Sequence, residues 1–293
     1  MNILRKFRWA FCVFVAPSFL IYTYLVIFPI VSSMAYSLTK WNAISPAVFV
    51  GLNNYEALFK SKDFAIVMTN TWIGLGLALV IQVGFGLLIS FLLYQTKAGY
   101  RAFRAMAFLP VVLAPAAVAL MFVLIFNSDI GPVNKILESI GLSGLKRNWL
   151  SDKDIVFYTV LSPMIYQFIG LYVIVLLAGM QSIPPEILES SAIDGAGSFR
   201  TFTMIIVPMI WDIIFICVTL ITAGSFKAFE HSYLMTWGGP GVRSAFLGVY
   251  MYLRTFIDAN FGLGCAIGMV ILFISLAVTM IFRAVVRRLD YQS

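Results

Sequence analysis

The chain has 293 residues, of which 61% are hydrophobic and only 11% carry a charged side chain. Soluble globular proteins average about a quarter charged residues, so this composition excludes an ordinary soluble protein. The formal net charge of +7 then reflects basic residues placed around membrane segments and not a nucleic-acid-binding surface. The composition predicts an integral membrane protein in a lipid bilayer, with no nucleic-acid partner.

The chain contains six apolar runs with few or no charged residues. Each run is long enough to cross a hydrocarbon core of about 30 Å as a helix. Proline residues within several runs predict bent helices, because neighbouring groups can bond the carbonyls that proline frees. The predicted fold class is an all-α polytopic membrane protein with six transmembrane helices. These spans cover residues 9–31, 64–94, 105–126, 155–180, 203–223 and 261–282.

Basic residues orient these spans through their placement. With the N-terminus inside, ten Lys and Arg residues fall on each side, so their number alone decides nothing. On the side of the membrane that holds the N-terminus, the basic residues form short strips at the ends of spans. The strips at residues 5–8 and 97–104 contain no acidic residue. Those on the other side are diluted through longer loops that also contain acids, so both termini are predicted to be cytoplasmic. A short amphipathic helix is expected on the outer surface at residues 53–60.

A polar, helix-breaking segment at residues 181–204 separates the fourth and fifth spans. Pro184 and Pro185 suit the first turn of a short helix, where a missing N–H costs nothing. Glu186 and Glu189 would lie near the positive N-terminal end of that helix. The segment therefore predicts a short helix outside the membrane.

Small residues follow in the same segment. Gly195 permits the left-handed turn that ends a helix. Ala192 and Ala196 are small enough to let the helix lie closely in a groove of another protein. The segment is interpreted as a docking helix, and the alternative is an ordinary loop with a Pro-Pro start and an Asp-Gly stop.

The sequence from Glu189 to Ala196, followed at a matched distance by Ile-Ile-Val and Pro208, resembles the cytoplasmic EAA loop of binding-protein-dependent ABC importer permeases. The likeness is to the sugar-importing branch, which includes the maltose importer's membrane subunits. Ser190 and Ser191 stand where the family usually has two alanines. Both are small, so a close approach to an ATPase remains possible.

The resemblance implies a fold, a set of partners and a role for the polar segment. The fold would be a type I ABC importer permease core at residues 64–293, preceded by an extra transmembrane helix and outer loop at residues 1–63. The partners would be a second homologous permease, two ABC ATPase subunits that bind ATP and Mg, and an extracytoplasmic solute-binding protein. The substrate would be a sugar, and the membrane the cytoplasmic membrane of a bacterium or archaeon. The implied ATPase-coupling residues, within a coupling loop at 181–204, are Glu186, Glu189, Ala192, Asp194, Gly195, Ala196 and Pro208.

The chain has none of the motifs expected of an ATPase or a hydrolase. It contains no Gly-x-x-x-x-Gly-Lys-Ser/Thr phosphate loop, no His-Glu-x-x-His and no Gly-x-Ser-x-Gly. Its one histidine, His231, cannot make a metal site alone. No catalysis, metal or cofactor is expected in this chain, and ATP hydrolysis is expected in a separate subunit.

Two stretches are candidates for the substrate pathway. In the sugar-permease family the residues before the Thr-x-Gly-Gly-Pro element, here residues 236–240, line the translocation path. A helix crossing obliquely to a central cavity would keep Lys227 and Glu230 in the membrane, where Lys227 would meet an anionic sugar. The alternative is an interfacial pair with Lys227 snorkelling. The family's other cavity-lining stretch falls in the fourth span, where core packing explains the two tyrosines equally well. The candidates from both stretches are Tyr166, Gln167, Gly170, Tyr172, Ser225, Lys227 and Glu230.

An ion-coupled secondary transporter is the alternative function. It would need intramembrane carboxylates and commonly an internal repeat. Only Asp212 lies inside an apolar run, and no repeat is visible. Asp212 is expected to be an interfacial carboxylate that bonds backbone freed by Pro208 or a neighbouring Arg, with a gate role as the alternative. A membrane enzyme is disfavoured because no nucleophile or metal constellation is present.

Overall fold

The computed structural model describes residues 8–96 and 100–290, with side chains described within 14–96 and 101–284. These residues divide into two compact units. The first comprises Met1–Ser61 and Met251–Leu272, and the second comprises Lys62–Tyr250 and Phe273–Ser293. The division at Ser61 lies close to the boundary expected at residue 63, but the first unit also takes in residues 251–272.

The first unit begins with a long apolar helix. It continues through α2 (Arg8–Tyr22), the π-helical turn η1 (Thr23–Ile27) and α3 (Phe28–Tyr36). An antiparallel pair, β1 (Thr39–Lys40) and β2 (Val48–Phe49), leads to α4 (Asn53–Lys60), which confirms the helix predicted at residues 53–60. Asn54 of α4 donates to the carbonyls of Ser37 and Thr39 at 2.8 and 2.9 Å, which holds α4 against the end of α3.

The first unit also contains η5 (Leu253–Ile257) and the start of α17 (Phe261–Asp290). Gly262 allows α17 to approach the first hairpin, because a Cβ there would lie only 2.0 Å from the carbonyl oxygen of Thr39. The ring of Trp41 lies 4.3 Å from that of Tyr36 and 5.6 Å from that of Phe261. Segments from the two ends of the sequence therefore share one small core.

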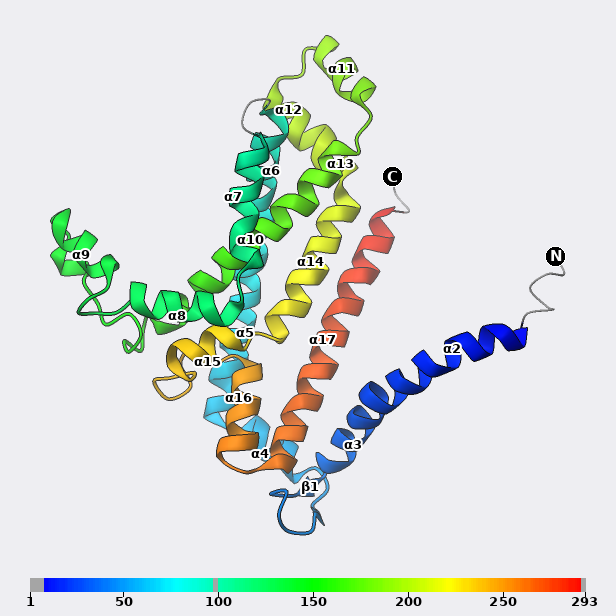
Figure 1. Cartoon of the computed structure of the whole chain (residues 1–293), viewed down its shortest axis with the longest axis vertical. Coiled ribbons are helices and arrows are strands. Elements are labelled where there is room, and N and C mark those ends of the chain that lie inside the picture. Colours follow the sequence, from blue (N-terminus) through cyan, green and yellow to red (C-terminus); the bar gives the residue numbers. More distant parts are fainter. Residues whose placement is uncertain (1–7, 97–99, 291–293) are drawn as a thin grey trace. The chain divides into compact units, whose positions relative to one another are not determined.

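The second unit contains the remaining long helices, with the helix α10 at its centre (Figure 1). Its elements in chain order are α5 (Lys62–Ala78), η2 (Leu79–Val83), α6 (Gly84–Gln95), α7 (Tyr100–Val112), α8 (Pro115–Ile125), α9 (Pro132–Ser139), η3 (Ser143–Leu145), α10 (Val156–Gln181), α11 (Pro185–Ile193), α12 (Ser198–Thr201), η4 (Phe202–Ile206), α13 (Val207–Met209), α14 (Trp211–Phe226), α15 (Glu230–Thr236) and α16 (Leu247–Tyr252).

Polar side chains from the α5–η2–α6 helix bond to the backbone of α10. The Nε2 of Gln82 donates to the carbonyl of Ile165 at 3.2 Å, and the Oγ of Ser90 donates to that of Val173 at 2.8 Å. Between them, a Cβ at Gly86 would lie 3.1 Å from the side chain of Leu176, so the helices approach closely there. Small residues and interhelical hydrogen bonds are the usual means of helix association in membranes, where burial of apolar surface gives little drive.

The third predicted span is broken. α7 and α8 meet at an angle of 94°, at a break that contains Leu113 and Ala114. Pro115 begins α8, and the residue before a proline is pushed out of the helical range, here to φ −60° and ψ 132° at Ala114. The bent helix that the prolines predict is confirmed, but the bend is sharp enough to make two helices.

Five helices in the described ranges are long and apolar enough to cross a membrane. The bent pair α7 and α8 raises the number to six if both together form one span. The all-α membrane class is therefore confirmed, while the number of six and the orientation stay predictions. The five helices cover Phe14–Tyr36, Lys62–Gln95, Val156–Gln181, Trp211–Thr236 and Phe261–Ala284.

The fifth span differs from its predicted bounds of 203–223 at both ends. The chain forms η4 and α13 before a break at Ile210, where φ is −101° and ψ is 18°. Pro208 lies just before this break, and a proline removes one helical hydrogen bond and crowds the preceding turn. α14 begins at Trp211 and continues past Ala223 to Phe226, so hydropathy alone ended the helix too early.

Candidate functional site

The polar segment after α10 forms a helix, as predicted. α11 begins at Pro185, with Pro184 before it at φ −56° and ψ 130° and Glu186 in its first turn. The fixed φ and missing N–H of proline fit these positions. Figure 1 shows α11 at one end of the second unit, beyond the ends of α6 and α10 and far from α15.

Gly195 ends α11 in the left-handed turn that the sequence predicts, with φ +78°. The Gly195 N–H donates to the carbonyl of Ala192 at 3.1 Å, and the Ala196 N–H donates to that of Ser191 at 3.0 Å. This pair of bonds is the Schellman motif. A Cβ at Gly195 would meet no atom within 4 Å, so glycine is required by backbone conformation and not by space.

Most of the predicted coupling residues lie on the surface of this chain. Ser191, in contrast, is buried and its hydroxyl donates to the carbonyl of Leu188 at 2.8 Å, so this serine faces its own unit. Sequence reasoning missed two apolar neighbours, Ile193 and Phe199, which are 86% and 79% exposed. Their apolar character in a polar segment is the signal that could have identified them, because large exposed apolar side chains beside polar ones can mark a contact surface. The exposed predicted residues are Glu186, Glu189, Ala192, Asp194, Gly195 and Pro208, and Ala196 is half-buried.

Two of the pathway candidates in α10 pack against the α7–α8 break. Gln167 is fully buried, and its Nε2 donates to the carbonyl of Leu113 at 2.9 Å. That carbonyl lies outside both helices, so it lacks the N–H that a continuous helix would supply. Gly170 lies one turn further along, where a Cβ would be only 1.8 Å from the carbonyl oxygen of Ala107. In this chain both residues hold α7 and its break against α10.

The two tyrosines of the same stretch lie in different surroundings. Tyr172 is buried among its own helices. Tyr166 is 49% exposed, and its ring lies 5.9 Å from that of Phe122 in α8. Of the α10 candidates, only Tyr166 therefore opens onto the surface of the chain.

The second candidate stretch forms the junction of α14 and α15. Lys227 follows the last residue of α14, and Glu230 begins α15. Both side chains are exposed, whereas Ser225 is buried. No ion pair joins Lys227 to Glu230, although both belong to the described residues. Each of the two charged side chains can therefore interact with another charged group.

Asp212 lies in the first turn of α14 and is exposed. Within the described ranges it bonds neither the backbone near Pro208 nor an arginine. An acidic residue in a first helical turn is stabilised by the helix dipole. The N-terminus of α14 therefore takes the place of the backbone or arginine partner expected for Asp212.

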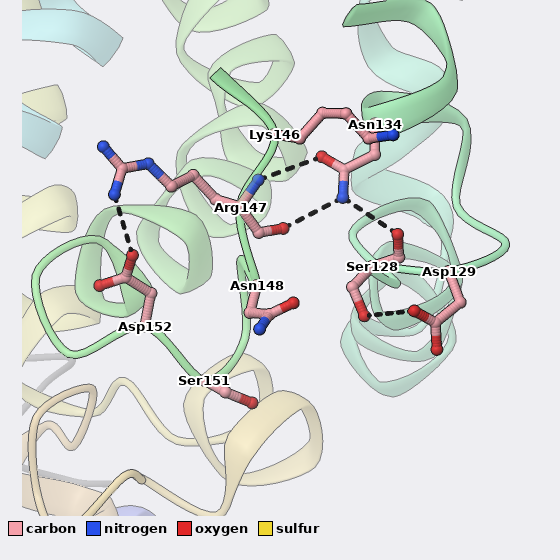
Figure 2. A pocket seen from close by; sticks show the side chains of 8 residues that line it. All are labelled: Ser128, Asp129, Asn134, Lys146, Arg147, Asn148, Ser151 and Asp152. Atoms are coloured by element: carbon pink, nitrogen blue, oxygen red, sulfur yellow. Dashed lines mark hydrogen bonds and ion pairs between the residues drawn. The ribbon is translucent and has the colours of Figure 1, made fainter. Parts of the chain in front are cut away.

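A polar pocket of about 550 Å³ lies among the loops around α9 (Figure 2). Asn134 organises it: its amide nitrogen donates to the carbonyls of Ser128 and Arg147 at 3.0 and 3.1 Å. Its amide oxygen accepts the indole N–H of Trp149 at 2.8 Å. The lining holds charges of both signs, and the described residues contain no group of His, Cys, Asp or Glu suited to a metal. The lining residues are Ser128, Asp129, Asn134, Lys146, Arg147, Asn148, Ser151 and Asp152.

Solved structures confirm the fold. The permease chain in the crystal structure of a bacterial alginate ABC transporter, in complex with an alginate pentasaccharide-bound periplasmic protein, superposes with a TM-score of 0.86. The two chains are 21% identical, and the match covers 99% of this chain and 98% of that one. At this identity the likeness establishes the architecture, a type I importer permease.

Sequence relatives cover nearly the whole chain. A probable ABC transporter permease, YurN of Bacillus subtilis strain 168, is 33% identical over 270 residues, 91% of this chain and 92% of YurN. The arabinooligosaccharide transport permease AraP of the same organism is 28% identical, over 92% of this chain and 85% of AraP. The sulfoquinovosyl glycerol transport permease SmoG of Agrobacterium fabrum is 26% identical, over 94% of this chain and 89% of SmoG. Residues 82–291 match the model of the binding-protein-dependent transport system inner membrane component, and the chain belongs to that family of ABC transporter permeases.

Proposed function

We propose that this chain is the membrane permease of an ATP-driven importer for a sugar or oligosaccharide. Relatives named for arabinooligosaccharides and for sulfoquinovosyl glycerol support a sugar substrate. The observation that carries the proposal is α11, an exposed helix between two apolar spans that ends in a Schellman turn at Gly195. A membrane protein that builds a rigid helix outside the bilayer, flanked by exposed apolar side chains, presents it to another protein.

The ATPase is the partner proposed for α11. Glu186 and Glu189 offer carboxylates to basic groups, and the exposed Ile193 and Phe199 offer apolar contacts. Two ABC ATPase subunits, carrying ATP and Mg, would close on each other and move α11. The movement would switch the permease between inward-facing and outward-facing states, with ATP biasing a two-state equilibrium.

A second homologous permease completes the pathway in this proposal. Tyr166, Lys227 and Glu230 are exposed on this chain alone and would line its half of the route. Gln167, Gly170 and Tyr172 would support that wall from behind, because they are buried within the chain. A solute-binding protein would deliver the sugar on the extracytoplasmic side. The crystal structure of the similar alginate transporter, which contains a periplasmic protein, supports such a partner.

A secondary transporter is not favoured. Its coupling ion would need buried intramembrane carboxylates. Among the described residues, Asp212 and Glu230 are both exposed, and neither pairs with a buried cation.

Transport by the complete complex tests the proposal. The permease is reconstituted in proteoliposomes with a second permease, an ABC ATPase and a solute-binding protein. The labelled probes are maltotriose, arabinotriose, an alginate trisaccharide and sulfoquinovosyl glycerol. We expect uptake of at least one probe that requires both ATP and the binding protein. Uptake of none, or uptake by the permease alone under a proton or sodium gradient, would contradict the proposed function.

A further inference from the structure

Three aromatic side chains form a continuous stack beside the junction of α14 and α15. The ring centroids of Phe229 and Tyr233 lie 4.9 Å apart, with an interplanar angle of 18°. Those of Tyr233 and Trp237 lie 4.8 Å apart, with an angle of 44°. Phe229 directly precedes α15, Tyr233 lies within it and Trp237 directly follows it, and the ring contacts join all three. We refer to Phe229, Tyr233 and Trp237 as the aromatic stack.

The stack lies opposite the buried face of α15, with Phe229 and Tyr233 half-buried. The opposite face buries His231, Ser232 and Met235, and Met235 belongs to an apolar cluster with Ala119 of α8. Trp237 at the end of the stack is 59% exposed. The buried face fixes the helix, and of the three stack residues only Trp237 is exposed.

Trp237 occupies a backbone conformation that its side chain disfavours. Its φ is 55° and its ψ is 27°, in the left-handed region where a bulky residue is an outlier. The surrounding loop holds this conformation: the Trp237 N–H donates to the carbonyl of Tyr233 at 2.8 Å, and the Gly238 N–H donates to that of Ser232 at 3.2 Å. The hydroxyl of Ser244 closes the loop by donating to the carbonyl of Gly239 at 2.9 Å.

A large aromatic residue at such a position is a reason to look for function. Glycine or asparagine would fit the same turn with less strain, and strained positions persist mainly where the side chain has a task. Here the strain places an exposed indole at the end of two other rings. The loop bonds at Gly238 and Ser244 keep that indole in a defined place.

Charged groups lie at the other end of the stack. Lys227 and Glu230 flank Phe229 in the sequence, and both are exposed without an ion pair between them. Flat aromatic faces stack on the C–H faces of sugars, and a few charged or polar groups then fix orientation. The eight residue steps from Phe229 to Trp237 cover about 12 Å at 1.5 Å per step, which exceeds a single sugar ring.

We propose that the aromatic stack is a subsite for an oligosaccharide, which stacks on Trp237 and moves along Tyr233 toward Lys227 and Glu230. The inference rests on the proposed sugar transport and adds to it a place and a mode of recognition. The subsite recognises the apolar face of a sugar ring and not its charge. It therefore serves neutral and acidic oligosaccharides alike, and charge selection falls to Lys227.

Substitutions at Trp237 separate the ring from the backbone. Trp237→Gly and Trp237→Asn both remove the ring, and both residues accept a left-handed conformation, so the loop keeps its shape. Trp237→Phe keeps an aromatic face and is the matched control. The measurement is KM for ATP-driven uptake of the transported probe sugar in proteoliposomes. We expect KM to rise about two- to tenfold for the Gly and Asn variants, the range of one aromatic contact, and to stay within about twofold for Phe.

The other outcomes overturn the proposal in distinguishable ways. An unchanged KM for both the Gly and Asn variants would show that the ring does not meet sugar. Less inserted protein or a lower melting temperature at unchanged KM would show that Trp237 is an anchor at the lipid interface, because aromatic residues are also enriched there. A wild-type complex that transports none of the four probes would defeat the proposed function itself, before any Trp237 variant is compared.

Discussion

Asn70 in α5 donates a hydrogen bond from its Nδ2 to the backbone carbonyl of Arg243, at 2.9 Å. The same amide group donates to the carbonyl of Ala245 at 3.1 Å. The next residue, Thr71, accepts the N–H of Leu247 at 3.2 Å. Two adjacent side chains of one helix therefore fasten the loop between α15 and α16, which also carries the end of the aromatic stack.

Removal of the Asn70 amide should loosen this loop. Asn70→Leu keeps the volume but leaves the carbonyls of Arg243 and the buried Ala245 without their donor, which costs roughly 1–3 kcal/mol. We expect a lower melting temperature in detergent and faster trypsin cleavage after the exposed Arg243. Thr69→Val is the control, because Thr69 is exposed and bonds only the Ala65 carbonyl of its own helix. Equal cleavage rates in the two variants would contradict the role of Asn70.

Gln167 and Gln82 should differ in importance, although each donates to a carbonyl of a membrane helix. Gln82 bonds the carbonyl of Ile165, which lies inside the continuous helix α10. Gln167 bonds the carbonyl of Leu113, which lies in the α7–α8 break. Unbonded backbone is costly in a bilayer. Gln167→Met should therefore lower the melting temperature more than Gln82→Met, and the opposite order would mean that the break is stabilised by other groups.

Cysteine labelling tests six spans with both termini cytoplasmic. Single cysteines at Ser61 and Ser143 should react with an impermeant thiol reagent from outside, and those at Gln95 and Ser293 only from inside. The informative position is Ser143, because it follows the bent pair α7 and α8. Labelling of position 143 from inside alone would show that the pair turns back without crossing.

Lys227 and Glu230 should respond to the charge of the substrate. Among the described residues no carboxylate pairs with the exposed Lys227, so it is available to an acidic sugar, and Lys227→Met should raise KM for the alginate trisaccharide more than for maltotriose. Glu230→Gln should have little effect on either sugar. If the two residues neutralise each other during transport, the double variant will be milder than either single one, by a coupling of about 0.5–3 kcal/mol. Wild-type transport by both single variants would place these side chains outside the pathway.

The sequence predicts those elements that follow from local chemistry. The apolar runs locate the membrane helices, since a bilayer leaves few alternatives to a helix. Pro184, Pro185 and Gly195 locate α11, because proline and glycine restrict the backbone wherever they stand. The surface helix α4 follows from its own amphipathic pattern.

The remaining features depend on partners distant in sequence. The family resemblance places Gln167 in a cavity-lining stretch of the fourth span, but its partner is the carbonyl of Leu113, which no pattern in that span reveals. The exposure of Trp237 depends on which face of α15 is buried against α8, and its strain depends on a loop closed by Ser244. α14 continues past the apolar run to Phe226, which is buried and lies against Trp72 of α5, a contact that hydropathy does not reveal.

The central claim is that α11 couples ATP hydrolysis to transport, and Gly195 tests it most directly. Gly195→Val puts a β-branched residue at φ +78°, where an L-residue costs roughly 1–2 kcal/mol, so the Schellman turn should be lost. Gly197→Val is the matched control, because Gly197 lies in the same loop at an ordinary φ of −70°. The measurement is the number of sugar molecules imported per ATP hydrolysed by the reconstituted complex. We predict that this ratio falls severalfold for Gly195→Val at normal expression and stays near wild type for Gly197→Val, whereas a wild-type ratio for Gly195→Val would contradict the coupling role of α11.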